Sequence, residues 1–334
     1  MISRRLDFMA LSNPDAYKRN YGFWSDAEQA SLGQSKVSIG GVGGDGFQLG
    51  VKLAMMGVER FSAADPEEFE IENSNRVFGA NSRTYGKNKA EVFRDTVLDI
   101  RPNATVEIYT EGVTRENVEE FMKDADLVLD ESELTYPDVG TMIARQARKQ
   151  QIPDLLVMNI GFAGIATSFH PQSKNTFEKM MGIPKDMPLE DIANMSVDLS
   201  RCLPYVPNYA DFASLEAVQE SLVAAQQNLV AAQEGLEAVP KGASLPSISP
   251  GVDIASALGS TEAFLHLTAG VNNKRRNPTW APRFRYMDAY NGKSGVINFP
   301  RVSHYLGLAA MVARSQMHLN PRASYRQDER DARS

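Results

Sequence analysis

The residues with the clearest chemical potential form a glycine-rich run, Gly41-Val42-Gly43-Gly44-Asp45-Gly46. They follow a short apolar segment that is predicted to be a buried strand, and they precede a predicted helix. Glycines permit a tight turn and a close approach of backbone N–H groups to a phosphate, and the helix N-terminus adds partial positive charge. Asp65 ends the next predicted strand, 65 − 46 = 19 residues after the last glycine, near the spacing of a ribose-binding acid. The pattern predicts a nucleotide site.

One residue of this run is unusual for a phosphate site. The carboxylate of Asp45 would repel a phosphate, so we expect it to cap the helix or to face a magnesium ion. Taken alone, the run and Asp65 are also compatible with a dehydrogenase that uses NAD, or with a structural turn that binds nothing.

The residues that follow favour a different chemistry. Downstream lie Asp65-Pro66-Glu67, Asn73-Ser74-Asn75-Arg76, Gly86-Lys87-Asn88-Lys89 and Asp130-Glu131-Ser132-Glu133. In this order they resemble the ThiF/MoeB/HesA family, the bacterial relatives of ubiquitin-activating enzymes, whose pattern is GxGGxG, DxD, NxxR, GxxK and a strand ending in Asp. Further segments that resemble family elements are Tyr17-Lys18-Arg19-Asn20, Gly161–Pro171 and Ser247–Gly270, with Glu262 at the family's glutamate.

The resemblance implies an activity and a role for each matching residue. Family members adenylylate a carboxylate with ATP, which brings two anions together, so the site must neutralise charge and align the attack. The implied nucleotide-binding residues are Gly41, Gly43, Gly44, Gly46, Asp65 (ribose), Glu67, Asn73, Arg76 and Lys89. The implied catalytic residues are Asn73, Arg76, Lys89, Asp130 (magnesium) and Arg19, which would reach the γ-phosphate in the neighbouring subunit of a homodimer.

The sequence also departs from the family pattern. Many members hold a structural zinc with two CxxC pairs, but this chain has a single cysteine, Cys202, and we expect no zinc. Cys202 lies in the segment where some members carry a catalytic thiol, and a small buried side chain is the plainer interpretation. The family's Asp-Asn after the fourth strand is replaced by Glu133-Leu134, which puts the substrate-side contacts in doubt.

The elements that must position these residues alternate between strands and helices. Strands are predicted at 36–41, 60–65, 105–109, 126–130 and 155–159, with helices at 47–56, 88–100, 117–123 and 138–150. This alternation is typical of a mostly parallel sheet covered on both faces. The sequence after 160 predicts an antiparallel strand, a helix at 252–269 and a hairpin around Asn291-Gly292.

A seven-residue repeat stands out between these regions. Leucines recur at Leu215, Leu222, Leu229 and Leu236, which predicts a helix with a coiled-coil-like seam that packs on its own domain or on a partner. We divide the chain into an N-terminal helical arm with the trans arginine (1–35), a Rossmann-like ATP-binding domain (36–171), a helical crossover insertion (172–245), a C-terminal helix and hairpin that complete the sheet (246–322) and a tail (323–334).

Composition narrows the classes of function. The chain has 334 residues, 35 Lys+Arg against 42 Asp+Glu and a net charge of −7, which gives no general attraction to nucleic acid or an anionic membrane. It shows neither a targeting segment nor a run of 18 apolar residues, so we expect a cytoplasmic protein.

These observations lead to an α/β protein with a Rossmann-like, mostly parallel sheet, an antiparallel extension and a helical crossover insertion. We expect an ATP- and magnesium-dependent adenylyltransferase that forms an acyl-adenylate on a peptide or small metabolite and uses no enzyme thioester. The alternatives are the C-terminus of a ubiquitin-like sulfur carrier as substrate, a nucleotide-binding scaffold that docks a partner through 215–239, and a Rossmann oxidoreductase.

Overall fold

The protein contains one eight-stranded sheet in the part of the chain that the computed structural model describes, which comprises residues 14–20, 22–133, 136–195, 246–272 and 274–298. The strands are β1 (Lys36–Gly40), β2 (Arg60–Ala64), β3 (Thr105–Tyr109), β4 (Leu127–Asp130), β5 (Asp154–Ile160), β6 (Ala163–Phe169), β7 (Arg283–Asp288) and β8 (Lys293–Asn298). Their order across the sheet is β3-β2-β1-β4-β5-β6-β7-β8.

The sheet is parallel over its first five strands and antiparallel beyond them. β1 pairs in parallel with both β2 and β4, β2 with β3, and β4 with β5. β6 runs antiparallel to β5 and to β7. The chain leaves β1 toward β2 and later returns to β4 on the other side of β1, and ligands of open α/β sheets bind at the carboxyl ends of strands beside such a reversal of direction.

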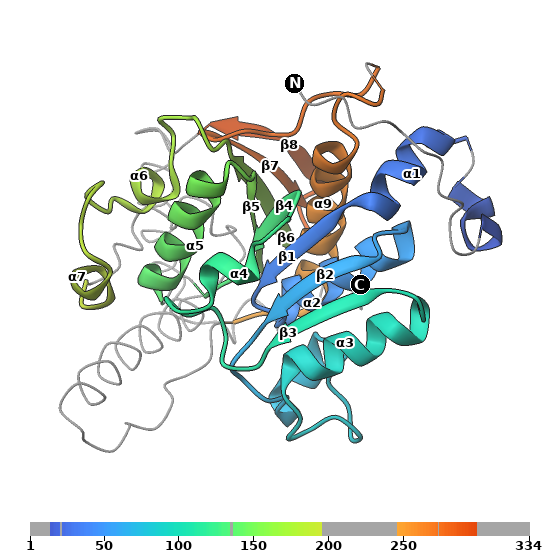
Figure 1. Cartoon of the computed structure of the whole chain (residues 1–334), viewed down its shortest axis with the longest axis horizontal. Helices are drawn as coiled ribbons and strands as arrows, with labels where there is room; N and C mark the ends of the chain where they lie inside the picture. Colours follow the sequence, from blue (N-terminus) through green and yellow to red (C-terminus); the bar gives the residue numbers. More distant parts are fainter. Residues whose placement is uncertain (1–13, 21, 134–135, 196–245, 273, 299–334) are drawn as a thin grey trace, which may run out of the picture. The chain divides into compact units, whose positions relative to one another are not determined.

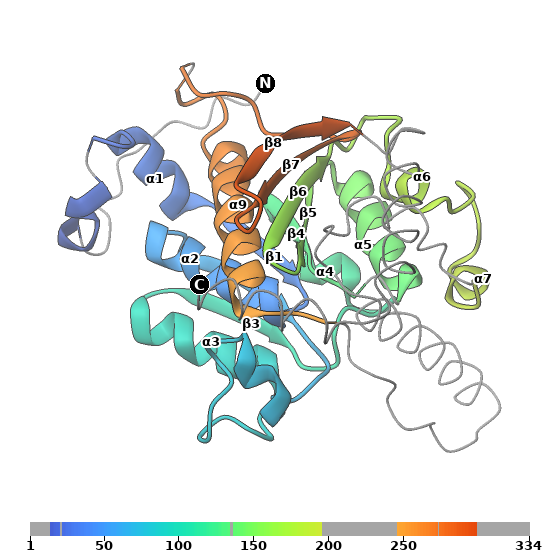
Figure 2. The same ribbon diagram turned by 180° about the vertical axis from the view of Figure 1, so that it is seen from behind.

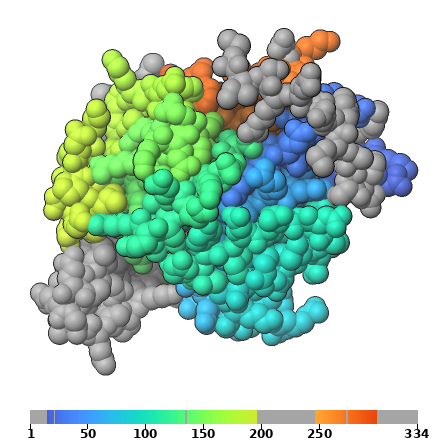
Figure 3. Space-filling view, in the orientation of Figure 1, coloured from blue at the N-terminus to red at the C-terminus, as the bar shows by residue number. Residues whose placement is uncertain are grey.

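Helices cover both faces of the sheet (Figure 1). The helices are η1 (Pro14–Asn20), α1 (Asp26–Gln34), α2 (Gly44–Met56), η2 (Ile71–Asn75), α3 (Lys89–Ile100), α4 (Val118–Phe121), α5 (Pro137–Gln150), α6 (Phe177–Met181), α7 (Leu189–Ala193) and α9 (Ser249–Leu267). α2, α3 and α9 lie on one face, seen from behind in Figure 2, and α4 and α5 lie on the other. Figure 3 shows the second layer from green to yellow, with α6 and α7 beside α5.

Strand β4 shows how alternation produces the two layers. Leu127 and Leu129 belong to the apolar cluster under α2, α3 and α9, whereas Val128 belongs to the cluster under α4 and α5. All three side chains are fully buried. Successive side chains of a strand point to opposite faces of the sheet. The Asp130 side chain therefore lies on the face covered by α5, and the Glu131 side chain lies on the face covered by α2.

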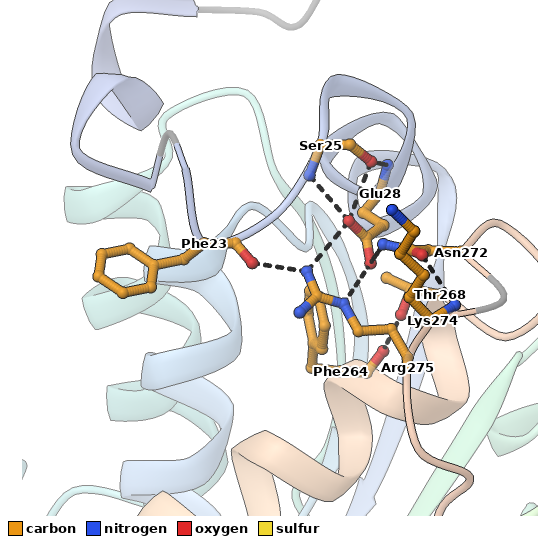
Figure 4. Close-up of polar contacts among 8 residues, drawn as sticks. All are labelled: Phe23, Ser25, Glu28, Phe264, Thr268, Asn272, Lys274 and Arg275. Atoms are coloured by element: carbon orange, nitrogen blue, oxygen red, sulfur yellow. Dashed lines mark hydrogen bonds and ion pairs between the residues drawn. The ribbon is translucent and has the colours of Figure 1, made fainter.

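A buried ion pair joins α1 to the segment after α9 (Figure 4). Glu28 is fully buried and accepts hydrogen bonds from Arg275 Nε at 2.8 Å, from the Ser25 backbone at 2.8 Å and from Asn272 Nδ2 at 3.3 Å. Arg275 lies over the ring of Phe264 at 5.4 Å. We call Ser25, Glu28, Asn272 and Arg275 the Glu28 clasp. It closes the N-terminal arm onto the end of the main core.

The predicted fold class is confirmed. Each predicted strand and helix of residues 36–171 is present, with ends that agree or differ by up to three residues; α2, for example, begins at Gly44 rather than Phe47. The antiparallel strand is β6, the late helix is α9, and β7 and β8 neighbour each other on either side of Asn291-Gly292. The heptad segment 215–239 lies outside the described residues, and the domain boundaries stay a prediction. None of the described helices is long and apolar enough to cross a bilayer.

Candidate nucleotide site

The glycine-rich turn lies between β1 and α2, at the carboxyl edge of the sheet. Gly41 has a φ of +108°, and a Cβ there would lie 2.3 Å from the carbonyl oxygen of Glu131. A Cβ on Gly46 would lie 2.0 Å from the Gly41 carbonyl oxygen, so both positions require glycine. Gly43 differs, because no atom lies within 4 Å of the place its Cβ would take. The turn is closed from behind and open at Gly43, where a phosphate can approach backbone N–H groups.

Asp65 supports this turn from the end of β2. It is buried, and its carboxylate accepts hydrogen bonds from the backbone nitrogens of Val42 and Glu67, each at 2.9 Å. Burial raises the pKa of Asp65 to about 6, against the opposing effect of nearby Lys89. The predicted ribose acid therefore also holds the phosphate turn in shape.

Lys89 reaches the same edge as the first residue of α3. Asn88 caps this helix, because its Oδ1 accepts from the Ala90 backbone at 2.9 Å, and its Nδ2 donates to the Asp65 carbonyl at 2.9 Å. The Lys89 ammonium pairs with Glu67 Oε2 at 2.5 Å, and its side chain is largely buried. The structure thus brings Asp65, Glu67 and Lys89 together, as predicted.

Arg76 approaches the turn from the end of η2. Its Nε lies 3.9 Å from the position of a Cβ on Gly44, the first residue of α2. The buried amide of Gln48 donates to the Arg76 carbonyl at 2.7 Å and fixes its backbone. Asn73 is buried and accepts from the Glu70 backbone at 3.0 Å, which shapes the η2 turn. Arg76 therefore faces the phosphate turn, whereas this contact of Asn73 supports the loop that carries Arg76.

Asp130 ends β4 beside the turn and is fully buried. Its Oδ1 accepts from the Ser132 hydroxyl at 2.6 Å and the Ser132 backbone at 3.2 Å, but its Oδ2 has no hydrogen-bond partner. Burial raises the pKa of Asp130 to about 6, and the bonds from Ser132 oppose this shift. An unpartnered buried oxygen at a strand end fits a cation ligand.

The donor set of this edge fits magnesium better than a metal held by protein alone. Within the described residues, no group of three or more His, Cys, Asp and Glu has the geometry to hold a metal ion. Magnesium beside nucleotides takes one or two carboxylates and completes its shell with water and phosphate oxygens. Asp130 with its free Oδ2 meets that requirement.

Asp45 points away from the open side of the turn. Its Oδ2 accepts from the backbone nitrogen and the side-chain nitrogen of Asn159 at the end of β5, both at 2.9 Å. Burial raises the pKa of Asp45 to about 6, and the bonds from Asn159 oppose it. The expectation that Asp45 caps the helix is wrong, because α2 has no side-chain cap and the Asp45 carboxylate instead ties α2 to β5.

Sequence reasoning missed a group of buried acids behind the turn. Burial raises the pKa of Glu131 and of Asp154 well above their ordinary values, and neighbouring carboxylates add to both shifts. Glu131 Oε1, Asp45 Oδ1 and both carboxylate oxygens of Asp154 have no hydrogen-bond partner. We call Asp45, Asp130 and Glu131 the acidic edge; Asp154 instead begins β5 and pairs with Val128 of β4. The sequence carries no local signal for this group, because its members come from segments that are remote along the chain.

One other predicted residue, Arg19, is not part of this assembly in its own chain. Arg19 is exposed on η1, and Tyr17 two residues earlier packs beside Gly57, the residue that caps the far end of α2. A 13-residue helix is about 20 Å long, so Arg19 lies far from the turn of its own chain. Cys202 lies outside the described residues.

The sheet order, the glycine turn and the charged residues at the carboxyl edge define a nucleotide-binding α/β protein. The chain matches the ThiF family over residues 17–304, and it belongs to that family. The family inferred from the motifs is thereby confirmed.

Similar proteins match about a third of the chain. The tRNA threonylcarbamoyladenosine dehydratase of Haemophilus influenzae is 30% identical over 125 residues, which are 36% of this chain and 48% of that protein. The probable molybdopterin-synthase adenylyltransferase of Gracilaria tenuistipitata var. liui is 30% identical over 105 residues, 31% of this chain and 30% of that protein. The chain therefore matches less than half the length of each.

Solved structures align over more of the chain. Escherichia coli MccB with ATP aligns with a TM-score of 0.58 at 15% identity, over 86% of this chain and 73% of that one. The same enzyme with MccA gives a TM-score of 0.59 at 16% identity, over 87% and 73%. At this level of identity the likeness concerns the fold.

Proposed function

We propose that this protein is an ATP-dependent adenylyltransferase that activates a substrate carboxylate as an acyl-adenylate and releases pyrophosphate. The observation that carries the proposal is the convergence of the open glycine turn, the Arg76 guanidinium and the buried Asp130 on one edge of the sheet. Support also comes from family membership and from relatives whose names describe adenylyltransferase activity or a complex with ATP.

In the proposed reaction, a carboxylate oxygen attacks the α-phosphorus of ATP and the bond to the pyrophosphate oxygen breaks. Backbone N–H groups at the start of α2 bind phosphate oxygens, and Arg76 and Lys89 neutralise charge that grows in the transition state. Asp65 accepts from the ribose hydroxyls with its remaining lone pairs. Asp130 would hold a magnesium ion, and that ion would supply further positive charge against the phosphates.

Pyrophosphate exchange tests the proposal. Purified protein is incubated with ATP, magnesium, labelled pyrophosphate and one carboxylate class at a time: peptides, small carboxylates, or a small protein ending in Gly-Gly. We expect exchange that depends on a peptide or small carboxylate and is lost in Arg76→Ala but kept in Arg83→Ala, which changes an exposed arginine of the next loop. ATP binding without exchange for any carboxylate overturns the enzyme assignment.

The handover of the acyl group is tested separately. We propose that the acceptor attacks the adenylate directly, so Cys202→Ser keeps full turnover. Loss of turnover in that variant, with exchange retained, would instead establish a thioester step.

The proposed homodimer has its own test, because Arg19 lies far from the turn of its own chain. Arg19→Ala and Arg76→Ala subunits are each expected to be inactive. Mixed dimers contain one intact site, so a mixture recovers roughly a quarter of wild-type activity if Arg19 acts across a two-fold interface. No recovery in verified mixed dimers would exclude that arrangement.

A further inference from the structure

A chain of hydrogen bonds connects the Arg76 guanidinium with the segment that leads into α9. Arg76 Nη1 donates to Asn75 Oδ1 at 2.8 Å and to the Glu72 carbonyl at 3.2 Å. The other end of the same Asn75 amide, Nδ2, donates to the Ser247 carbonyl at 3.0 Å. Asn75 therefore bridges two segments that are 172 residues apart.

Ser247 also contacts the phosphate turn by a second route. Its hydroxyl donates to Asn159 Oδ1 at 2.9 Å, and Asn159 in turn donates to Asp45 within the turn. The backbone of Ser247 is thus tied toward Arg76, and its side chain is tied toward Asp45. Ser247 is therefore connected by hydrogen bonds to two sides of the carboxyl edge of the sheet.

The side chains of Asn75 and Arg76 are held by hydrogen bonds rather than by packing. Asn75 is exposed and Arg76 is only partly buried, so packing does not fix either side chain. A long arginine side chain loses about 2 kcal/mol of rotamer entropy when it is held in one conformation. Contacts that hold it before the ligand arrives reduce that cost at the moment of binding. The bond from Nδ2 to the Ser247 carbonyl restrains the Asn75 amide, and with it the Oδ1 that accepts from Arg76.

We propose that Asn75 is a positioning residue that orients Arg76 at the phosphate turn and couples that orientation to Ser247. The inference rests on the proposed function, because it assumes that Arg76 meets the phosphates of ATP. It assigns to Asn75 no contact with substrate.

Three variants separate the two halves of the bridge. Asn75→Ala removes both bonds. Asn75→Asp keeps an oxygen for Arg76 but replaces the donor with an acceptor that faces the Ser247 carbonyl. Ser74→Ala is the matched control, since Ser74 is an exposed neighbour with one hydrogen bond, to the Ile71 carbonyl at 2.6 Å.

The measurements are the affinity for a non-hydrolysable ATP analogue by calorimetry, the KM for ATP and kcat of exchange, and the melting temperature. We expect Asn75→Ala to weaken affinity and raise the KM by about 5- to 10-fold, the loss typical of one or two hydrogen bonds. The kcat should fall as well, because Arg76 also acts in the transition state, and the melting temperature should change little. Asn75→Asp should show most of this loss, and Ser74→Ala none. Wild-type behaviour of Asn75→Asp would overturn the coupling to Ser247.

A double-mutant cycle with Arg76→Ala completes the test. If Asn75 acts through Arg76, Asn75→Ala has no further effect once Arg76 is absent. A full additional loss in the double variant overturns the inference. If Arg76→Ala weakens binding but Asn75→Ala does not, only this inference fails. Unchanged affinity in Arg76→Ala contradicts the inference and also the role of Arg76 in the proposed function.

Discussion

The Glu28 clasp and the acidic edge both contain buried carboxylates, and their surroundings differ in opposite ways. In the Glu28 clasp, Glu28 is fully buried, accepts bonds from Arg275, Ser25 and Asn272, and has its pKa lowered to about 2, chiefly by the bond from Arg275. In the acidic edge, Asp130 is equally buried, but one of its oxygens has no partner and burial raises its pKa to about 6.

This difference in hydrogen-bond partners distinguishes carboxylates that stabilise the fold from those that serve a ligand. A buried charge with all its partners holds segments together, and removal of one partner is costly. A buried oxygen without a partner reduces stability, and one that lies beside a phosphate turn can be satisfied by a ligand. The clasp therefore has the character of a structural joint, and the acidic edge has the character of a binding site.

The largest expected effect comes from Asp130→Asn, which keeps the shape but removes the charge. We expect exchange activity to fall by about 10²- to 10³-fold, as for loss of one preorganised charge contact at a reacting group, with an unchanged or higher melting temperature. The control is Asp154→Asn, which removes another unpartnered buried carboxylate and should keep activity. Unfolding of Asp130→Asn in step with its loss of activity would contradict the comparison.

The clasp should respond in the reverse manner. Glu28→Gln is expected to lower the free energy of unfolding by about 3 kcal/mol, the lower end for a broken buried pair, because Arg275 is one-third exposed. The rate per folded molecule should not change. Glu120→Gln, in the exposed pair with Lys123, should change stability by less than about 0.5 kcal/mol. Denaturant titration measures the free energy of unfolding of both variants. Equal losses in Glu28→Gln and Glu120→Gln would show that the clasp stabilises no more than an exposed ion pair.

The two regions also differ in the sign of their pH dependence. Asp45 has a pKa of about 6 in the folded protein against an ordinary 3.8, so the folded state binds more protons between pH 4 and 6. Stability from this group therefore falls as pH rises through that window, by about 2–3 kcal/mol. Glu28, with its lowered pKa, contributes stability above pH 4.5 that is lost as pH falls toward 2.

Asp45→Asn tests this sign, since an amide oxygen can still accept from Asn159. The variant should be more stable than the wild type at pH 7, and the difference should shrink toward pH 4. Unfolding measured by denaturant at both pH values supplies the comparison. A difference that is the same at pH 4 and pH 7 would show that Asp45 does not titrate in this range.

Much of the fold was predictable from the sequence because its signals are local. The glycine run, the alternation of short apolar segments with helical patterns, and Asp65 and Asp130 at strand ends were enough to place the phosphate turn and the order of elements. The ends of helices were less certain: α2 begins within the turn itself, because Gly44 already adopts helical geometry although its residue type favours a turn.

The rest depends on contacts between distant segments. A sequence shows that Asp45 is acidic, but its direction is set by Asn159, 114 residues away. The Glu28 clasp joins residues 247 apart, and Asn75 meets Ser247 only because η2 and α9 reach the same edge of the sheet.

Local signals in the sequence were therefore enough for the family, the parallel sheet and several of the residues that meet at the glycine turn, among them Asp65, Lys89 and Asp130. Only the tertiary structure decided which buried carboxylates have partners and which do not, and that Arg76 is held by Asn75. The physical reason is that residue type and local spacing set backbone conformation, whereas hydrogen-bond satisfaction and burial depend on which remote segments pack together.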